Sequence, residues 1–267
     1  MKNHVSIIAS FLVTILFFGC PSQEVKKEKP APKPVTTKKP NEPEMTIQLA
    51  SLDLSLYGKK IEHADISKFT EEMRREKIDI LTLQGITRYP GLATRIDVVD
   101  ELSKSAEMRS AFGETISLNN RQNGNAIFST YPIRSNENTH YANLQSNGFE
   151  TALQAVIDCG VRDVVVVGTK LPTKVSIEEL ESASGTLNGF NAFYINHPII
   201  IAGSIPRDAS PQFSQTYNET QRTRDADAPH VWYSSDGSLK FISSRAVKTV
   251  FGSMVIVQFG IFRQKQP

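Results

Sequence analysis

The sequence has few of the residues that build disulfide frameworks or metal centres. It holds only two cysteines, Cys20 and Cys159, and no cysteine or histidine pairs at the spacing of metal ligands. So few cysteines exclude the disulfide framework of small secreted domains. Cys159 lies among apolar residues, so we expect a buried small hydrophobic side chain there rather than a nucleophile.

The chain also lacks a large excess of either charge. The formal net charge is +2 in 267 residues, and it comes from the N-terminal part. Residues 21–45 hold six lysines against four glutamates, which together with Lys2 leaves residues 46–267 near −1. Proteins that bind the nucleic-acid backbone usually show a clear basic excess. Nucleic acid is therefore not an expected partner.

The first 20 residues have the shape of an export signal. Lys2 precedes an apolar run over residues 5–18, and Gly19 and Cys20 close it. The run resembles a bacterial lipoprotein signal, in which the cysteine becomes the first mature residue and carries the lipid. That resemblance implies a membrane anchor at Cys20 in the cell envelope, at the outer rather than the inner membrane. An uncleaved N-terminal anchor is the alternative.

Residues 21–45 contain six prolines and almost no large apolar side chain. Such a segment cannot bury enough surface to offset its ordering entropy. Its composition predicts an extended tether of about 3 Å per residue. The predicted organisation is a signal peptide over 1–19, the lipidated cysteine and tether over 20–45, and one domain over 46–267.

Hydrophobic periodicity beyond residue 45 alternates between helix and strand at first and favours strands later. The pattern predicts a layered α/β domain with at least eight strands. Helices are expected at 65–77, with Asp65 as N-cap, 91–108 and 176–193; strands are expected at 46–54, 78–83, 124–130, 151–159, 162–171, 198–203, 228–235, 238–244 and 253–262.

Five segments in order carry a resemblance to one family. They read IQLASLDLSLYG, DILTLQGI, NGNAIFSTYPI, VVVVGTKL and PIIIAGSIPRD. Together they resemble the landmarks of the endonuclease/exonuclease/phosphatase superfamily, and GNAIFSTYPI is the most specific. The resemblance implies a four-layer α/β sandwich, with two packed mixed β-sheets flanked by helices. It also implies hydrolysis of phosphate esters with Mg²⁺ held by carboxylates.

The positions that carry this chemistry are substituted here. Asp53 stands at the family's first-strand Asn, and Gly85 at the Glu that is its principal metal ligand. Lys170 stands at a His, and Ser204 and Pro206 replace an Asp and an Asn. The family's Ser-Asp-His before the last strand has no counterpart in residues 250–255.

The substitutions favour a catalytically inactive binding or scaffold module that needs no metal or cofactor. Its expected contacts are the membrane and an unknown envelope protein or small phosphate ester. The alternative is a rewired phosphoesterase, in which Asp53, Lys170 and Asp208 use Mg²⁺ and His230 or His197 assists. A purely structural envelope lipoprotein is the third possibility.

Overall fold

The computed structural model describes residues 42–92, 95–142, 144, 148–172, 174–206, 216–220 and 229–263. The predicted signal peptide, Cys20 and most of the predicted tether lie outside these residues, so they stay predictions. Asp208 also lies outside them. Within the described part of the chain, no helix has the length and apolar character needed to cross a membrane.

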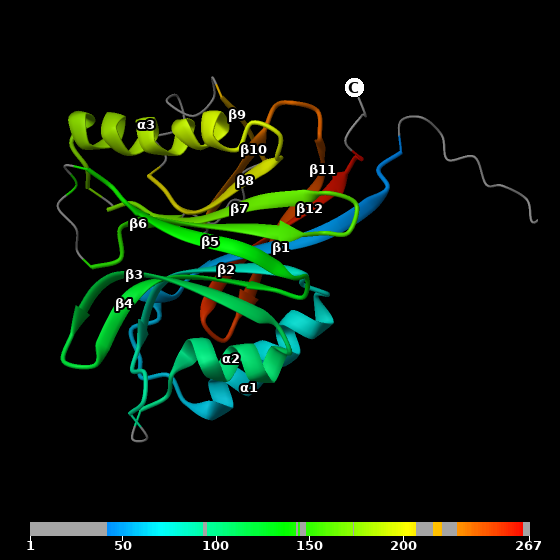
Figure 1. The fold of residues 1–267 in the computed structure, drawn as a ribbon. Helices are drawn as coiled ribbons and strands as arrows, with labels where there is room; N and C mark the ends of the chain where they lie inside the picture. The colour runs from blue at the N-terminus through cyan, green and yellow to red at the C-terminus, as the bar shows by residue number, and fades with distance from the viewer. Residues whose placement is uncertain are drawn as a thin grey trace, which may run out of the picture. The chain divides into compact units, whose positions relative to one another are not determined.

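Two mixed six-stranded sheets form the centre of the domain (Figure 1). Across the first sheet the order is β11 (Leu239–Thr249), β12 (Gly252–Ile261), β1 (Met45–Asp53), β2 (Ile80–Arg88), β4 (Arg121–Ser129) and β3 (Arg109–Leu118). Across the second it is β5 (Ile133–His140), β6 (Thr151–Asp158), β7 (Asp163–Lys170), β8 (Ile199–Ser204), β10 (His230–Ser234) and β9 (Tyr217–Glu219).

Helices cover the outer face of each sheet (Figure 1). Helices α1 (His63–Arg75) and α2 (Val98–Ala106) pack their apolar faces on β1, β2 and β4 of the first sheet. Helix α3 (Ile177–Phe193) covers the second sheet through a separate apolar cluster. The two helices α1 and α2, the first sheet, the second sheet and helix α3 make the predicted four-layer α/β sandwich, so the predicted fold class is confirmed.

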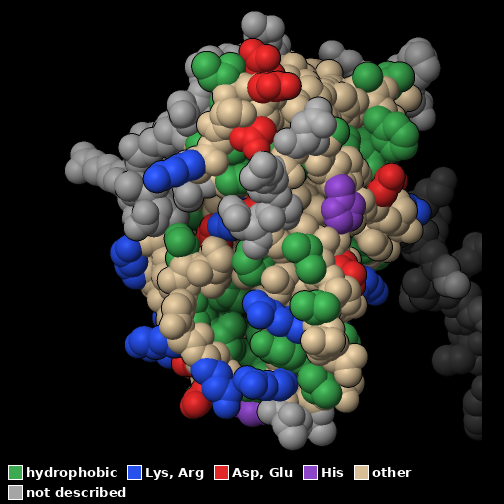
Figure 2. All heavy atoms as spheres, turned by 90° about the vertical axis from the view of Figure 1, so that its left-hand side faces the viewer, with side chains coloured by type: hydrophobic (Ala, Val, Ile, Leu, Met, Phe, Trp, Pro, Cys, Tyr) green, Lys and Arg blue, Asp and Glu red, His purple; other side chains and the backbone are tan. Residues whose placement is uncertain are grey.

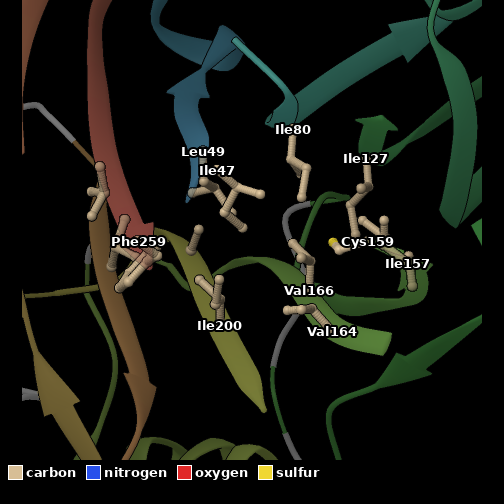
Figure 3. Packing of buried hydrophobic residues seen from close by; sticks show 14 of the residues in the cluster. Ile47, Leu49, Ile80, Ile127, Ile157, Cys159, Val164, Val166, Ile200 and Phe259 are labelled. Atoms are coloured by element: carbon tan, nitrogen blue, oxygen red, sulfur yellow. The ribbon is translucent and has the colours of Figure 1, made fainter. Parts of the chain in front are cut away.

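The main core lies between the two sheets. Side chains from both inner faces interdigitate there, and Figure 3 shows Ile47, Ile80, Val166 and Ile200 among them. Burying each such side chain contributes about 1.5–3 kcal/mol, which is what holds two sheets face to face. Cys159 is 2% exposed in this cluster, and burial raises the pKa of its thiol to about 12. The prediction that Cys159 is a buried side chain is therefore confirmed.

The helix boundaries differ from the predicted ones at their N-termini. Glu62, not Asp65, is the N-cap of α1, and Asp65 sits three residues later in a capping box. The helix expected over 91–108 begins only at Val98, because the Asp97 side chain accepts the backbone N–H groups of Val99 and Asp100 and so starts the helix there. The apolar pattern over 91–97 is therefore not helical in its described residues.

Three strands that periodicity did not predict are β3, β5 and β9, which lie at the edges of the two sheets. All three carry mostly exposed or half-exposed side chains. A strand with few buried side chains shows little apolar alternation, and its pairing comes from the backbone ladder instead.

Candidate functional site

The C-terminal ends of strands from both sheets meet at one place. Strand β7 pairs with β8 in parallel register, which puts Lys170 beside Ser204. In the other sheet, β1 pairs with β2 so that Asp53 is beside Gln84. Contacts between Asp53 and Lys170 then join the two sheets across their gap. We call Asp53, Ser55, Lys170 and Ser204 the strand-end cluster.

Every carboxylate oxygen of Asp53 already has partners in this cluster. Its side chain is 3% exposed, and Oδ2 forms an ion pair with Lys170 Nζ. The Ser204 hydroxyl donates to the same Oδ2 at 2.6 Å. The Ser55 hydroxyl donates to Oδ1 at 2.6 Å, and the Ser55 backbone N–H donates to it at 3.0 Å. A buried carboxylate needs such compensation, and here protein groups supply it.

Lys170 is held in the same closed arrangement. Its side chain is 12% exposed, and besides the Asp53 carboxylate its Nζ donates to the Ser55 hydroxyl at 2.9 Å. The ammonium therefore supplies the positive charge beside the carboxylate from within the chain. The result is a neutral, hydrogen-bonded cluster at the strand tips.

Strand β2 does not end at Gly85, as the sequence suggested, but continues to Arg88 through an irregularity in its pairing with β4 between Leu83 and Ile86. Gly85 has a φ of +67°, and its N–H donates to Asn125 Oδ1 at 3.2 Å. The position therefore requires a left-handed conformation that favours glycine.

The space at Gly85 is also taken. A Cβ there would lie 2.5 Å from the Ser55 Cβ and 3.1 Å from Asp53 Oδ1. Any residue other than glycine would therefore have to displace Ser55 and Asp53 of the strand-end cluster. The packing around Gly85 therefore leaves no room for a carboxylate side chain at this position.

The residues present do not fit the Mg²⁺ that the resemblance implied. Mg²⁺ requires oxygen ligands from one or two available carboxylates in near-octahedral geometry. The Asp53 carboxylate is engaged by three side chains and one backbone N–H, and Gly85 has no side chain. Within the described ranges, no group of three or more His, Cys, Asp or Glu residues is placed to hold a metal.

The two candidate histidines lie away from the cluster. His230 pairs with Gly203 across β10 and β8, and its ring is 5.6 Å from the Trp232 ring. Trp232 belongs to the apolar cluster under α3, so alternation along β10 puts His230 on the sheet face opposite Lys170. His197 precedes β8, at the end opposite Ser204. Pro206 follows β8 and is half-buried.

A pocket of about 380 Å³ opens beside the cluster. Ser55 of the strand-end cluster belongs to its wall, as does Gly85, whose Cβ position lies against Ser55. On the face drawn in Figure 2, Lys and Arg side chains gather around an apolar hollow. We call this the basic pocket; its lining residues are Leu54, Ser55, Tyr57, Gly58, Lys59, Lys60, Ile61, Gly85, Thr87, Tyr89, Arg95, Ile96, Val98 and Phe149.

Asn125 connects the pocket wall to the core. Its Nδ2 donates to the carbonyl of Phe149 at 2.9 Å, while its Oδ1 accepts the Gly85 N–H. One buried amide thus fixes two residues of the pocket wall that are far apart in sequence. Asn125 lies within the GNAIFSTYPI segment, so the most specific sequence motif contributes the hydrogen bonds that hold Gly85 and Phe149 in the pocket wall.

Sequence reasoning did not identify the basic pocket. The one available signal was the pair Lys59-Lys60 directly after LSLYG, which stands out in a domain without charge excess. Arg95 comes from a segment that was assigned to a helix. Convergence of the two segments depends on tertiary packing, and no local pattern encodes it.

Comparison with known proteins supports the fold. Neither the family models nor the curated protein sequences give a match. Among solved structures, an endonuclease/exonuclease/phosphatase from Beutenbergia cavernae matches with a TM-score of 0.63 at 13% identity, covering 81% of this chain and 72% of that one. A family protein from Leptotrichia buccalis matches with a TM-score of 0.63 at 9% identity, covering 80% and 99%.

The human Nocturnin catalytic domain, solved with a bound sulfate anion, matches with a TM-score of 0.62 at 15% identity, covering 81% of this chain and 93% of that one. Identities this low establish architecture and leave activity open. The chain therefore has the fold of the endonuclease/exonuclease/phosphatase proteins, as its strand motifs predicted.

Proposed function

We propose that this chain is an envelope-anchored binding module in which the endonuclease/exonuclease/phosphatase fold performs no hydrolysis. The observation that carries the proposal is the closed state of Asp53, whose two carboxylate oxygens are taken by Lys170, Ser204 and Ser55. A carboxylate used in this way is not available to hold a metal or to accept a proton from water.

The chemistry of phosphate hydrolysis explains why this matters. A bound cation must neutralise the charge that develops on the phosphoryl group, and a base must orient the attacking water. In the strand-end cluster the only cation is the Lys170 ammonium, and it is already paired with the Asp53 carboxylate. The composition of the cluster is therefore that of an ion pair that joins the two sheets rather than that of a reaction centre.

A rewired phosphoesterase using Asp53, Lys170 and Asp208 with Mg²⁺ is the competing function. It would require the Asp53–Lys170 pair to open so that the carboxylate could turn to a metal. The two Asp53 hydrogen bonds from Ser55 and Ser204 oppose that change. We therefore favour the non-catalytic function.

A hydrolysis assay with Mg²⁺, Mn²⁺ or Ca²⁺ tests this function on generic phosphodiesters and phosphomonoesters. We expect no turnover above buffer, and the same result from Asp53→Ala. Metal-dependent turnover that Asp53→Ala abolishes would overturn the proposal. Calorimetry with each metal is the second arm, where stoichiometric binding would favour the rewired enzyme.

The anchor is a separate part of the proposal. The signal-like first 20 residues and the tether support attachment through a lipid on Cys20. Expression of the full chain with labelled palmitate, followed by membrane fractionation, tests it. We expect label and membrane recovery to be lost together in Cys20→Ser, and equal membrane recovery of that variant would contradict lipid anchoring.

A further inference from the structure

Among the described residues, three cations and no carboxylate line the basic pocket. Lys59 and Lys60 follow the short helix Leu54–Leu56, and Arg95 follows β2. None of the three forms an ion pair with another residue in the described part of the chain, and no Asp or Glu lines the pocket. Because all three face the same space, their combined field attracts an anion.

The neighbouring Arg88 differs in this respect. Its guanidinium is paired with both Asp97 and Asp100. The adjacent hollow at the N-terminal ends of α1 and α2 also has Lys60 and Arg95 in its wall, but there they stand among carboxylates, which are Glu62, Asp97, Asp100 and Glu101. What distinguishes the basic pocket is that three cations converge on one space that no carboxylate of the described residues lines, and this convergence points to an anionic partner from outside.

The walls of the pocket suit a flat apolar group. Tyr57, Tyr89 and Phe149 line it together with aliphatic side chains such as Ile61 and Ile96. Arg95 lies over the Tyr89 ring at 5.4 Å from its centroid, which orients the guanidinium along the wall. A volume of about 380 Å³ falls within the range of small-molecule sites.

We propose that the basic pocket binds a small organic anion that carries a flat apolar group, with the group against Tyr57 and Tyr89 and the anion toward Lys59, Lys60 and Arg95. This deepens the proposed function, because it names the ligand class of the binding module. Recognition needs neither a metal nor a scissile bond. An aromatic sulfonate or carboxylate therefore satisfies it as well as any ester.

Two fluorescent probes separate charge from apolar character. 8-Anilinonaphthalene-1-sulfonate is a flat anion that cannot be hydrolysed here, and N-phenyl-1-naphthylamine is a neutral molecule of the same shape. Titrations of the full chain in EDTA should give one saturable sulfonate site, with the neutral probe at least about fivefold weaker. Equal affinity for both probes, or no saturation at millimolar sulfonate, would overturn the proposal.

Variants locate the site. The double variant Lys59→Ala/Lys60→Ala should weaken sulfonate binding about fivefold, and Arg95→Glu should weaken it more, because it also reverses the field. Lys68→Ala/Lys240→Ala removes two exposed lysines outside the pocket and serves as the matched control. If the control weakens binding as much as the pocket variants do, then general charge governs binding and the assignment fails.

The outcome is distinct from that of the proposed function. Failure of sulfonate binding with an inactive enzyme removes only the ligand class. Metal-dependent turnover with intact sulfonate binding removes only the non-catalytic function. Unfolding curves of each variant, recorded in parallel, ensure that lost binding is not lost fold.

Discussion

The strand-end cluster and the basic pocket share a wall but treat charge in opposite ways. In the cluster, the Lys170 ammonium and the Asp53 carboxylate neutralise each other inside the protein. In the pocket, Lys59, Lys60 and Arg95 keep their charges directed at open space. The comparison teaches that two adjoining regions of one fold can treat charge differently: the ends of the strands hold a paired carboxylate, whereas the loops beside them present cations without an ion-pair partner among the described residues.

The energetic consequence of a buried ion pair depends on what replaces it. Desolvation of both ions offsets most of their attraction, so an intact pair contributes little net stability. Removal of one partner leaves the other charge buried alone, which is strongly destabilising. The cluster should therefore be sensitive to single substitutions and tolerant of paired ones, whereas the pocket should tolerate both.

The largest expected effect comes from breaking the pair. Lys170→Met should lower the free energy of unfolding by about 3 kcal/mol or more, because Asp53 remains buried with only neutral donors. Urea denaturation measures the change. The double variant Asp53→Asn/Lys170→Met should recover part of the loss. Equal stability of Lys170→Met and the parent would mean that the pair is open in solution.

Restoring the missing carboxylate should not convert the cluster into a metal centre. Gly85→Glu should destabilise the fold by about 2–3 kcal/mol, because the residue has positive φ and its Cβ would meet Ser55. Gly160→Ala, at a φ of +76° with no atom near its Cβ, is the control for backbone strain alone and should cost about 1 kcal/mol. Calorimetric Mg²⁺ binding by Gly85→Glu would show that the cluster yields more readily than its packing implies.

Asn125 tests whether the shared wall couples the two regions. Asn125→Ala leaves the Gly85 N–H and the Phe149 carbonyl without their partner, at a cost of about 1–2 kcal/mol. Because Phe149 lines the pocket, sulfonate affinity should fall with stability. Unchanged affinity in a destabilised variant would mean that the pocket wall is held by other contacts.

The smallest effect contrasts Asp53 with a half-buried carboxylate, Asp79, which accepts the Gln48 N–H at 2.7 Å. Burial raises the pKa of Asp79, and hydrogen bonds from Gln48 and Tyr131 oppose the rise. The folded state then holds the proton more tightly than the unfolded state does. Stability from this group is therefore present at low pH and is lost as pH rises through the raised folded pKa.

Asp79→Asn removes that titration. The stability of the variant relative to the parent should increase as pH rises through this range, and urea midpoints from about pH 3 to about pH 7 measure it. A difference that stays constant with pH would mean that Asp79 titrates normally in the folded chain.

The sequence predicted the fold to the extent that burial controls it. Strongly apolar strands such as β7 and β8 were placed within two residues, since inter-sheet packing imposes their pattern. Edge strands β3, β5 and β9 were not predicted because most of their side chains are exposed or half-exposed. The early helix boundary at residue 91 was wrong because a single capping side chain, Asp97, overrides apolar periodicity.

The candidate site was predictable only in part. The positions of Asp53, Gly85, Lys170 and Ser204 followed from motif order, and the ends of the strands bearing them do converge. The Asp53–Lys170 ion pair was not predicted, because it depends on how the two sheets pack and its residues are far apart in sequence. The β2 irregularity at Gly85 likewise depends on Asn125, 40 residues away.

The buried Cys159 can report how often the two sheets separate. Cys159 lies between the sheets with its thiol pKa at about 12, and only a thiolate in contact with solvent reacts with an alkylating reagent. In a Cys20→Ser chain, the alkylation rate of Cys159 therefore depends on how often the two sheets separate and expose this thiol. The cluster and pocket variants can be ranked by this rate in native buffer, without denaturant and without altering a single core side chain.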